Sequence, residues 1–191
     1  MIVWRSPYYD QIVWRQLESA FLCVDFGWRI FYFVGAFVTM IITFCGHSKF
    51  IKTPQMEEKL MCLLEERVGD IPAQFFLGGY GGFDDFSYQC CKQYQKNHPK
   101  TKLIFVTPYI TAEYQKNHLS CAKDRYDEIV YPGIENKPKR FAILYRNKWM
   151  VDAADLVIAH IQYPYGGAYQ TYRYAQKKGK SLFNLSEIHT P

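Results

Sequence analysis

Paired cysteines and blocks of like charge are missing from the sequence. The six cysteines include no Cys-x-x-Cys pair and no histidine at a spacing typical of zinc, so we expect reduced thiols, no metal, no cofactor and a cytoplasmic protein. The net charge of +5 over 191 residues is spread along the chain. This distribution permits an anionic small-molecule ligand, and we do not expect nucleic acid as a partner. A homodimer is left open.

A clear membrane-spanning run is also missing. Residues 30–46 carry no charged side chain, and this length is close to the shortest that can cross a bilayer, roughly 17 residues. The last part of the run, Met40–Cys45, is typical of the first strand of a sheet. Only residues 30–39 would then remain, which is too short to cross. Acidic residues nearer the start also interrupt any secretory leader, so we expect no membrane contact.

Residues 1–39 form a hydrophobic extension that allows two interpretations. It is either a helical segment whose apolar side chains pack on the domain or on a partner, or an upstream extension of a protein that naturally starts at Met40. We favour the second, because Met40 stands directly before the predicted strand. The domain itself is expected at residues 40–187.

Strand-like and helix-like patterns alternate from Met40 onward. Further strands are predicted at residues 73–77, 102–107, 126–131, 156–161 and 181–185. Helices are predicted from Pro54, Phe83, Asn136 and Ala168, and a polar loop with some helix at residues 111–125. Such alternation predicts an α/β fold whose parallel sheet carries helices on both faces.

Glycine turns follow three of the predicted strands, at Gly46, at Gly78–Gly82 and at Gly166-Gly167. The carboxyl ends of parallel strands meet at one edge of the sheet, where such folds bind ligands. A glycine turn that leads into a helix also presents free N–H groups and the positive end of the helix dipole, which suits a phosphate or a carboxylate. We therefore predict one ligand pocket at this edge.

Several polar residues accompany these turns. Asp84, in the first turn of its helix, either caps free amides or holds ribose hydroxyls. His47 either contacts a ligand or is a structural histidine. Arg140 and Arg146 compete to present a guanidinium to a phosphate, and helical spacing lets only one of them face the pocket. Asn147 is predicted on the same helix face as Arg140.

Four blocks of the sequence, in this order, resemble a known family: Thr43–His47, Phe76–Asp84, Pro138–Asp152, and Gly166–Ala168 with Thr171. Over about residues 40–185 they resemble the small bacterial members of the SLOG superfamily, which joins the DNA-processing protein A family to the Lonely Guy phosphoribohydrolases. The resemblance implies a Rossmann-like, doubly wound sheet in three α/β/α layers. It also implies a nucleotide or nucleotide-derived ligand whose phosphate is held at the Gly166-Gly167 turn.

The sequence departs from the Lonely Guy pattern after this turn. Those enzymes carry a glutamate one turn into the helix, and it assists cleavage of the N-glycosidic bond. Here no carboxylate follows Thr171 until Glu187. An oxocarbenium-like transition state is hard to stabilise without a carboxylate at the sugar, unless the fold brings Asp84 or Asp152 there.

We therefore predict binding or sensing of a nucleotide-like small molecule at a glycine-lined pocket. The alternative is an N-glycosidase that acts on nucleoside 5'-monophosphates, and the third interpretation is single-stranded DNA binding. No catalytic residue is assigned. The predicted ligand-binding residues are Gly46, His47, Gly78, Gly79, Gly81, Gly82, Asp84, Pro108, Arg140, Arg146, Asn147, Gly166, Gly167 and Thr171.

Overall fold

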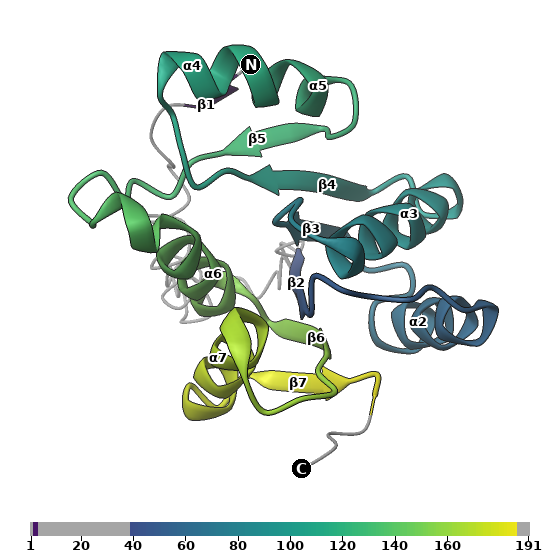
Figure 1. Ribbon diagram of the computed structural model, residues 1–191. Helices are drawn as coiled ribbons and strands as arrows, with labels where there is room; N and C mark the ends of the chain where they lie inside the picture. Colours follow the sequence, from purple (N-terminus) through teal and green to yellow (C-terminus); the bar gives the residue numbers. More distant parts are fainter. Residues whose placement is uncertain (1, 4–38, 187–191) are drawn as a thin grey trace, which may run out of the picture.

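The computed structural model describes residues 2–3 and 39–186, and these form one parallel β-sheet flanked by helices (Figure 1). The sheet order is β1-β5-β4-β3-β2-β6-β7, and every neighbouring pair is parallel. The strands are β1 (Ile2–Val3), β2 (Met40–Gly46), β3 (Ala73–Leu77), β4 (Thr101–Val106), β5 (Glu128–Val130), β6 (Leu156–His160) and β7 (Ser181–Asn184).

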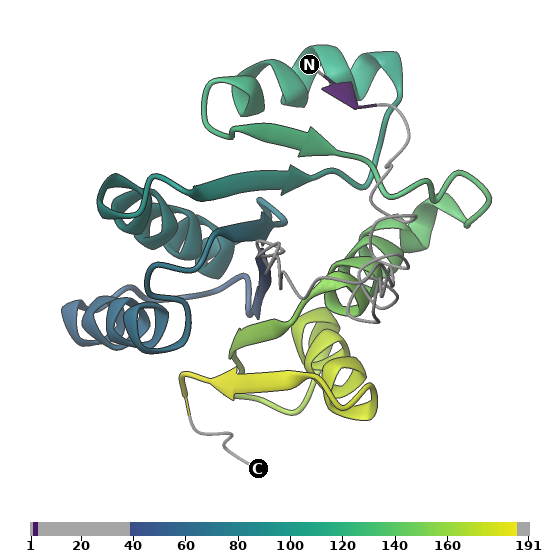
Figure 2. The same ribbon diagram turned by 180° about the vertical axis from the view of Figure 1, so that it is seen from behind.

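Helices cover both faces of the sheet, as the two opposite views show (Figures 1 and 2). Helices α2 (Pro54–Arg67) and α3 (Gly82–Asn97) lie on one face, and α6 (Ala142–Ala153) and α7 (Gly166–Lys177) on the other. Between β4 and β5 run α4 (Ala112–Tyr114), the π-helical turn η1 (Gln115–Leu119) and α5 (Ser120–Lys123). The predicted three-layer α/β/α fold is confirmed.

The hydrophobic core is divided by the sheet into two clusters, one on each face. The cluster under α2 and α3 includes Leu60 and Phe83, and the cluster under α6 and α7 includes Met150 and Ala175. The central strands bury all or nearly all of their residues, which is expected where helices cover both faces. The continuous apolar runs in the sequence are therefore the direct cause of the layered architecture.

The start of α2 shows how local sequence sets an element boundary. The hydroxyl oxygen of Thr53 accepts a hydrogen bond of 3.3 Å from the amide of Met56, and Pro54 occupies the first helical position. A capping side chain followed by proline is a strong helix start. Leu60, Leu63 and Leu64 are buried in this helix and anchor it on the sheet.

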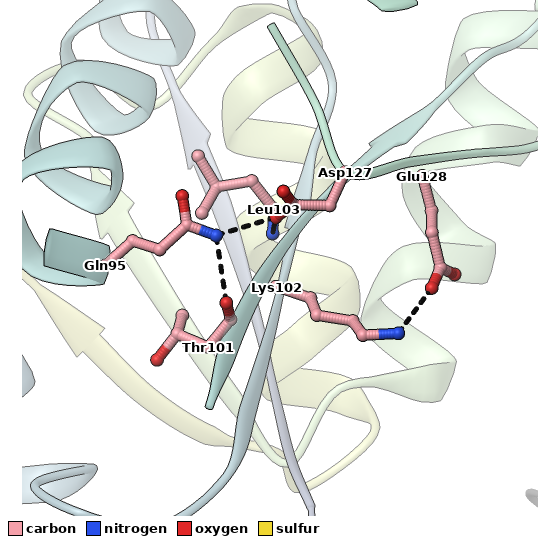
Figure 3. Close-up of polar contacts among 6 residues, drawn as sticks. All are labelled: Gln95, Thr101, Lys102, Leu103, Asp127 and Glu128. Atoms are coloured by element: carbon pink, nitrogen blue, oxygen red, sulfur yellow. Dashed lines mark hydrogen bonds and ion pairs between the residues drawn. The ribbon is translucent and has the colours of Figure 1, made fainter. Parts of the chain in front are cut away.

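A polar network holds α3 against the amino ends of β4 and β5 (Figure 3). The side-chain amide of Gln95 donates to the carbonyl of Thr101 at 2.9 Å and to the carboxylate of Asp127 at 2.7 Å. The same carboxylate accepts from the amide of Leu103 at 2.7 Å, and Lys102 pairs with Glu128 at 2.7 Å. This network lies at the opposite edge from the glycine turns, so it supports the sheet and leaves the carboxyl edge to other residues.

Strand order reverses between β2 and β6. From β2 the chain moves outward through β3, β4 and β5, and then returns to place β6 on the other side of β2. The loops after β2 and β6 therefore diverge to opposite faces, and a crevice opens between them. In open α/β sheets this switch point is where ligands bind.

Two helix starts differ from the prediction by two or more residues. The helix expected from Asn136 begins only at Ala142, after a 3-10 turn at Lys139–Phe141. Pro138 has a ψ of 128°, outside the helical region, and so delays the start. Helix α7 begins at Gly166, two residues earlier than predicted, so its glycines form the first helical turn.

Most of the predicted extension, residues 4–38, lies outside the described residues, as does residue 1. Ile2 and Val3 are described and pair in parallel with Ile129 and Val130 of β5. None of the helices within residues 39–186 is both long and apolar enough to cross a bilayer.

Candidate functional site

A cavity of about 470 Å³ lies at the switch point of the sheet. The loops after β2, β3 and β6 form three of its sides, and α6 forms the fourth. Its wall consists of Phe44–Lys49, Gly78, Tyr80, Asp84, Ile143, Arg146, Asn147, Met150, Tyr163, Tyr165 and Gly166–Ala168. The predicted convergence of glycine turns at one edge is thus present in the structure.

Arg146 is the buried cation of this wall, with 2% of its surface exposed. Its Nη1 atom donates to the carbonyl oxygens of Gly78 at 2.8 Å and Val106 at 2.9 Å, at the ends of β3 and β4. Within the described part of the chain it forms no ion pair, and its Nε has no partner. Burial lowers the pKa of Arg146, but a guanidinium stays charged at neutral pH. The positive charge is therefore buried without a salt bridge, although the carboxyl group of Asp84 in the same wall acts on it.

Asp84 is the carboxylate in the cavity wall, in the first turn of α3. Its Oδ2 atom accepts a hydrogen bond of 2.8 Å from the amide of Tyr80. Burial raises the pKa of this half-buried carboxyl to about 6, although Arg146 and the Tyr80 amide act to lower it. A carboxyl group with a pKa near neutral pH can exchange a proton with a bound ligand.

The amino end of α7 faces the cavity without a side-chain cap. Both glycines line the cavity, and a Cβ added at Gly166 or Gly167 would meet no atom within 4 Å. Thr171 fixes this turn, because its hydroxyl donates to the carbonyl of Gly167 at 3.0 Å and accepts from Asn147 of α6 at 3.3 Å. Free amides and the helix dipole make this end a site for an anion.

Aromatic rings form the outer part of the wall. His47, Tyr163 and Tyr165 follow one another, with ring centroids 5.6 Å apart in each successive pair. Nε2 of His47 accepts from the amide of Tyr163 at 3.3 Å, and burial lowers the pKa of His47, which favours the neutral form that accepts. Tyr80 and Tyr165 are each 66% exposed, so flat rings are available to a ligand at the mouth.

The predicted ligand-binding residues divide into two groups. Gly46, His47, Gly78, Asp84, Arg146, Asn147, Gly166 and Gly167 line the cavity, whereas Gly79, Gly81, Gly82, Pro108, Arg140 and Thr171 do not. The glycines of the second group allow segments of the protein to pack closely. A Cβ added at Gly79 would lie 2.7 Å from the Phe105 ring, and a Cβ added at Gly81 would lie 2.7 Å from Ser48. Pro108 is buried at the end of β4.

Arg140 does not share a helix face with Asn147, contrary to the prediction. It lies in the 3-10 turn before α6, where it is exposed and its guanidinium lies 4.7 Å from the ring centroid of Phe141. The late start of α6 removes it from the pocket side. Of the two competing arginines, Arg146 is the one in the cavity wall.

Sequence reasoning missed the tyrosines and the cation that complete the wall. Tyr163 and Tyr165 stand between β6 and the α7 glycines, and Lys49 stands three residues after Gly46. Each follows a strand whose neighbouring glycines were singled out. Their position in the same loops was the available signal.

Comparisons with known proteins bear on the fold. No protein-family model matches the chain, and no curated protein sequence matches it. Among solved structures, the chain is similar to DNA processing protein A from Helicobacter pylori, whose structure was reported for its single-stranded DNA binding mode. The TM-score is 0.51 and the sequence identity is 22%, and the match covers 76% of this chain and 64% of that chain. It is also similar to DNA processing protein A from Streptococcus pneumoniae, with TM-score 0.55, 16% identity, and 76% and 50% covered.

These likenesses establish a shared Rossmann-like fold of the kind that the SLOG resemblance implied. This chain spans 64% and 50% of those two proteins. They also contradict the expectation that nucleic acid is not a partner, because a protein with this fold binds single-stranded DNA. Scattered charge does not exclude nucleic acid, since helix-end amides and a few aligned cations can hold phosphates without a large net charge.

Proposed function

We propose that the cavity binds a nucleotide or a nucleotide-derived small molecule through its phosphate. The observation that carries this proposal is the buried guanidinium of Arg146, which has no ion-pair partner among the described residues. Burying a charge without an ion-pair partner is strongly unfavourable, and such groups are characteristic of functional sites. In this proposal the ligand phosphate supplies the ion-pair partner that Arg146 lacks among the described residues.

The amino end of α7 supports the same ligand. Its uncapped amides at Gly166 and Gly167 border the cavity that Arg146 lines. A phosphate there would accept backbone N–H bonds, interact with the helix dipole and meet a planar guanidinium. Lys49, also in the wall, adds a second positive charge.

The rest of the wall suits a nucleoside. A volume of about 470 Å³ falls within the range of about 300–1,000 Å³ typical of small-ligand sites. The rings of Tyr163 and Tyr165 can stack on a base, a contact that tolerates any base because each has a π-face. The carboxyl group of Asp84 is then available to ribose hydroxyls.

The sharpest test replaces Gly167, because the space beside it is empty. Gly167→Asp places a negative charge beside the proposed phosphate position, and Gly167→Asn is the neutral control of equal size. Calorimetric titration with nucleoside 5'-monophosphates should show binding to wild type and to the Asn variant, with affinity lost in the Asp variant. The Asp variant should be the more stable of the two by about 0.3–1 kcal/mol, because a negative charge stabilises a helix start. Equal affinities of the two variants would contradict the proposal.

Single-stranded DNA binding is the second candidate function. It is favoured by the fold shared with the Helicobacter pylori protein and by the exposed tyrosines at the mouth of the cavity. A fluorescently labelled oligonucleotide would then bind, and a nucleoside monophosphate would displace it. An oligonucleotide that fails to bind at low salt removes this candidate and leaves the first one standing.

A further inference from the structure

The outer surface of α6 and α7 carries a second hollow, which we call the outer groove. It has a volume of about 680 Å³ and shares no lining residue with the cavity. Three cationic side chains line it, Lys148 from α6 and Arg173 and Lys177 from α7, together with the rings of Tyr169 and Tyr174. Among the residues that the structure describes, no carboxylate lines the groove.

The two cations that α7 contributes to the outer groove are not neutralised by neighbours in the described part of the chain. Neither Arg173 nor Lys177 forms an ion pair within the described residues. The nearby carboxylate of Asp152 is engaged elsewhere, since it pairs with Lys178 at 3.1 Å and accepts from the Tyr174 hydroxyl at 2.9 Å. This contact also holds the Tyr174 ring in place at the groove.

The cations of the outer groove lie beside its aromatic rings. The ammonium group of Lys148 lies 5.4 Å from the centroid of the Tyr174 ring. Arg173 and Lys177 are four residues apart on α7, so they lie one turn apart on the same exposed face. Cations interleaved with aromatic rings are the chemistry that recognises a single nucleic-acid strand, in which phosphates meet charge and bases meet rings.

The outer groove begins close to the proposed phosphate site. Gly167, at the amino end of α7, precedes Arg173 by six residues, which corresponds to about 9 Å along the helix axis. The proposed phosphate site at Gly167 and the groove cation Arg173 therefore lie on the same helix. A strand with one phosphate at the amino end of α7 can continue along the same helix to Arg173 and Lys177.

We propose that the outer groove binds the sugar–phosphate backbone of a single-stranded nucleic acid whose adjoining nucleotide occupies the cavity. The placement of that nucleotide rests on the proposed function, whereas the groove contacts do not. The phosphates are held by Arg173, Lys177 and Lys148, and a base stacks on Tyr169 or Tyr174. An acidic peptide would use the same cations but would leave the two rings without a stacking partner.

The test compares two charge-reversed proteins. Arg173→Glu/Lys177→Glu changes the outer groove, and Lys96→Glu/Lys100→Glu makes the same charge change at exposed positions at and just beyond the end of α3. Binding of a labelled oligothymidylate is measured at about 50 and about 200 mM salt, because each lost phosphate contact lowers the salt slope by about 0.7 for a single strand. Thymidine 5'-monophosphate is titrated in parallel, and polyglutamate serves as a competitor.

The groove variant should bind the oligothymidylate at least about tenfold more weakly than the control variant, with a salt slope lower by about 1.4. Its affinity for thymidine 5'-monophosphate should equal that of wild type. Equal oligothymidylate affinity of the two variants, no oligothymidylate binding at all, or equally strong displacement by polyglutamate would each overturn the groove proposal. If the wild-type protein does not bind thymidine 5'-monophosphate, that result would instead count against the proposed function of the cavity.

Discussion

The Nη1 atom of Arg146 donates a hydrogen bond of 2.8 Å to the carbonyl oxygen of Gly78. This bond ties α6 to the end of β3 and brings the guanidinium against a backbone that has no side chain. A Cβ added at Gly78 would lie 2.5 Å from Nη1 of Arg146 and 2.8 Å from Oδ2 of Asp84. Glycine at this position therefore keeps the two charged groups of the cavity in place.

Substitution Gly78→Ala should destabilise the protein and weaken ligand binding. Contacts this short force Arg146 or Asp84 to move, and overpacking of this kind costs about 1–3 kcal/mol. Urea unfolding measures the stability, and calorimetry measures the affinity for a nucleoside monophosphate. Gly167→Ala is the matched control, because open space surrounds that position. It should be neutral or stabilising, and an unchanged stability of Gly78→Ala would contradict the packing described.

The stability of the protein should depend on the ionisation of Asp84. Burial raises the pKa of this carboxyl from 3.8 to about 6 in the folded chain, so the folded state holds a proton that the unfolded state releases. The stability linked to Asp84 is therefore fully present below pH 3.8 and is lost as the pH rises to about 6. Unfolding of wild type and Asp84→Asn, compared across this window, isolates the effect. Wild type should lose stability relative to the variant as pH rises, and the opposite slope would show that Arg146 dominates instead.

The tyrosine wall should contribute to base recognition and not to phosphate recognition. Tyr163→Ala should weaken nucleoside monophosphate binding by about 1–3 kcal/mol, the contribution of one stacked base, with no change in binding of ribose 5-phosphate. Tyr163→Phe keeps the ring and should bind like wild type. If Tyr163→Ala weakens both ligands equally, the ring supports the loop and does not stack.

We expect binding without cleavage of the N-glycosidic bond. Asp152, one of the two carboxylates that could have replaced the absent glutamate, accepts from Tyr174 and pairs with Lys178 outside the cavity wall. Asp84 is the carboxylate that does line the cavity. Incubation with nucleoside 5'-monophosphates, followed by chromatography, should give no free base above the background. Release of base that disappears in Asp84→Asn would make the protein an N-glycosidase.

Most of the fold followed from hydrophobic periodicity. The strand at Ala73–Leu77 and the helix that begins at Pro54 match their predicted bounds, because apolar runs and a capping threonine are local signals. The start of α6 did not follow, since the conformation of Pro138 delays it. That single boundary moved Arg140 off the helix and out of the pocket. A shift of a few residues at a helix start therefore decides which of two arginines faces a ligand.

The sequence predicted those parts of the site whose position depends only on the direction of the strands. Gly46 ends β2, and Gly78 and Gly166 follow β3 and β6, so a parallel sheet places all three at one edge. Residues such as Tyr163 and Tyr165 depend on how the loop after β6 turns, and the sequence does not encode that turn in a recognisable motif. The burial of Arg146 between two strand ends is likewise a tertiary property.

The central claim is that Arg146 and the amino end of α7 hold the phosphate of a nucleotide. The most direct measurement is calorimetric titration of the wild-type protein with a nucleoside and with its 5'-monophosphate under identical conditions. A hydrogen bond to a charged group contributes about 1.5–3 kcal/mol, so the monophosphate should bind at least about tenfold more tightly. Equal affinity for the two compounds, or binding of neither, would contradict the account.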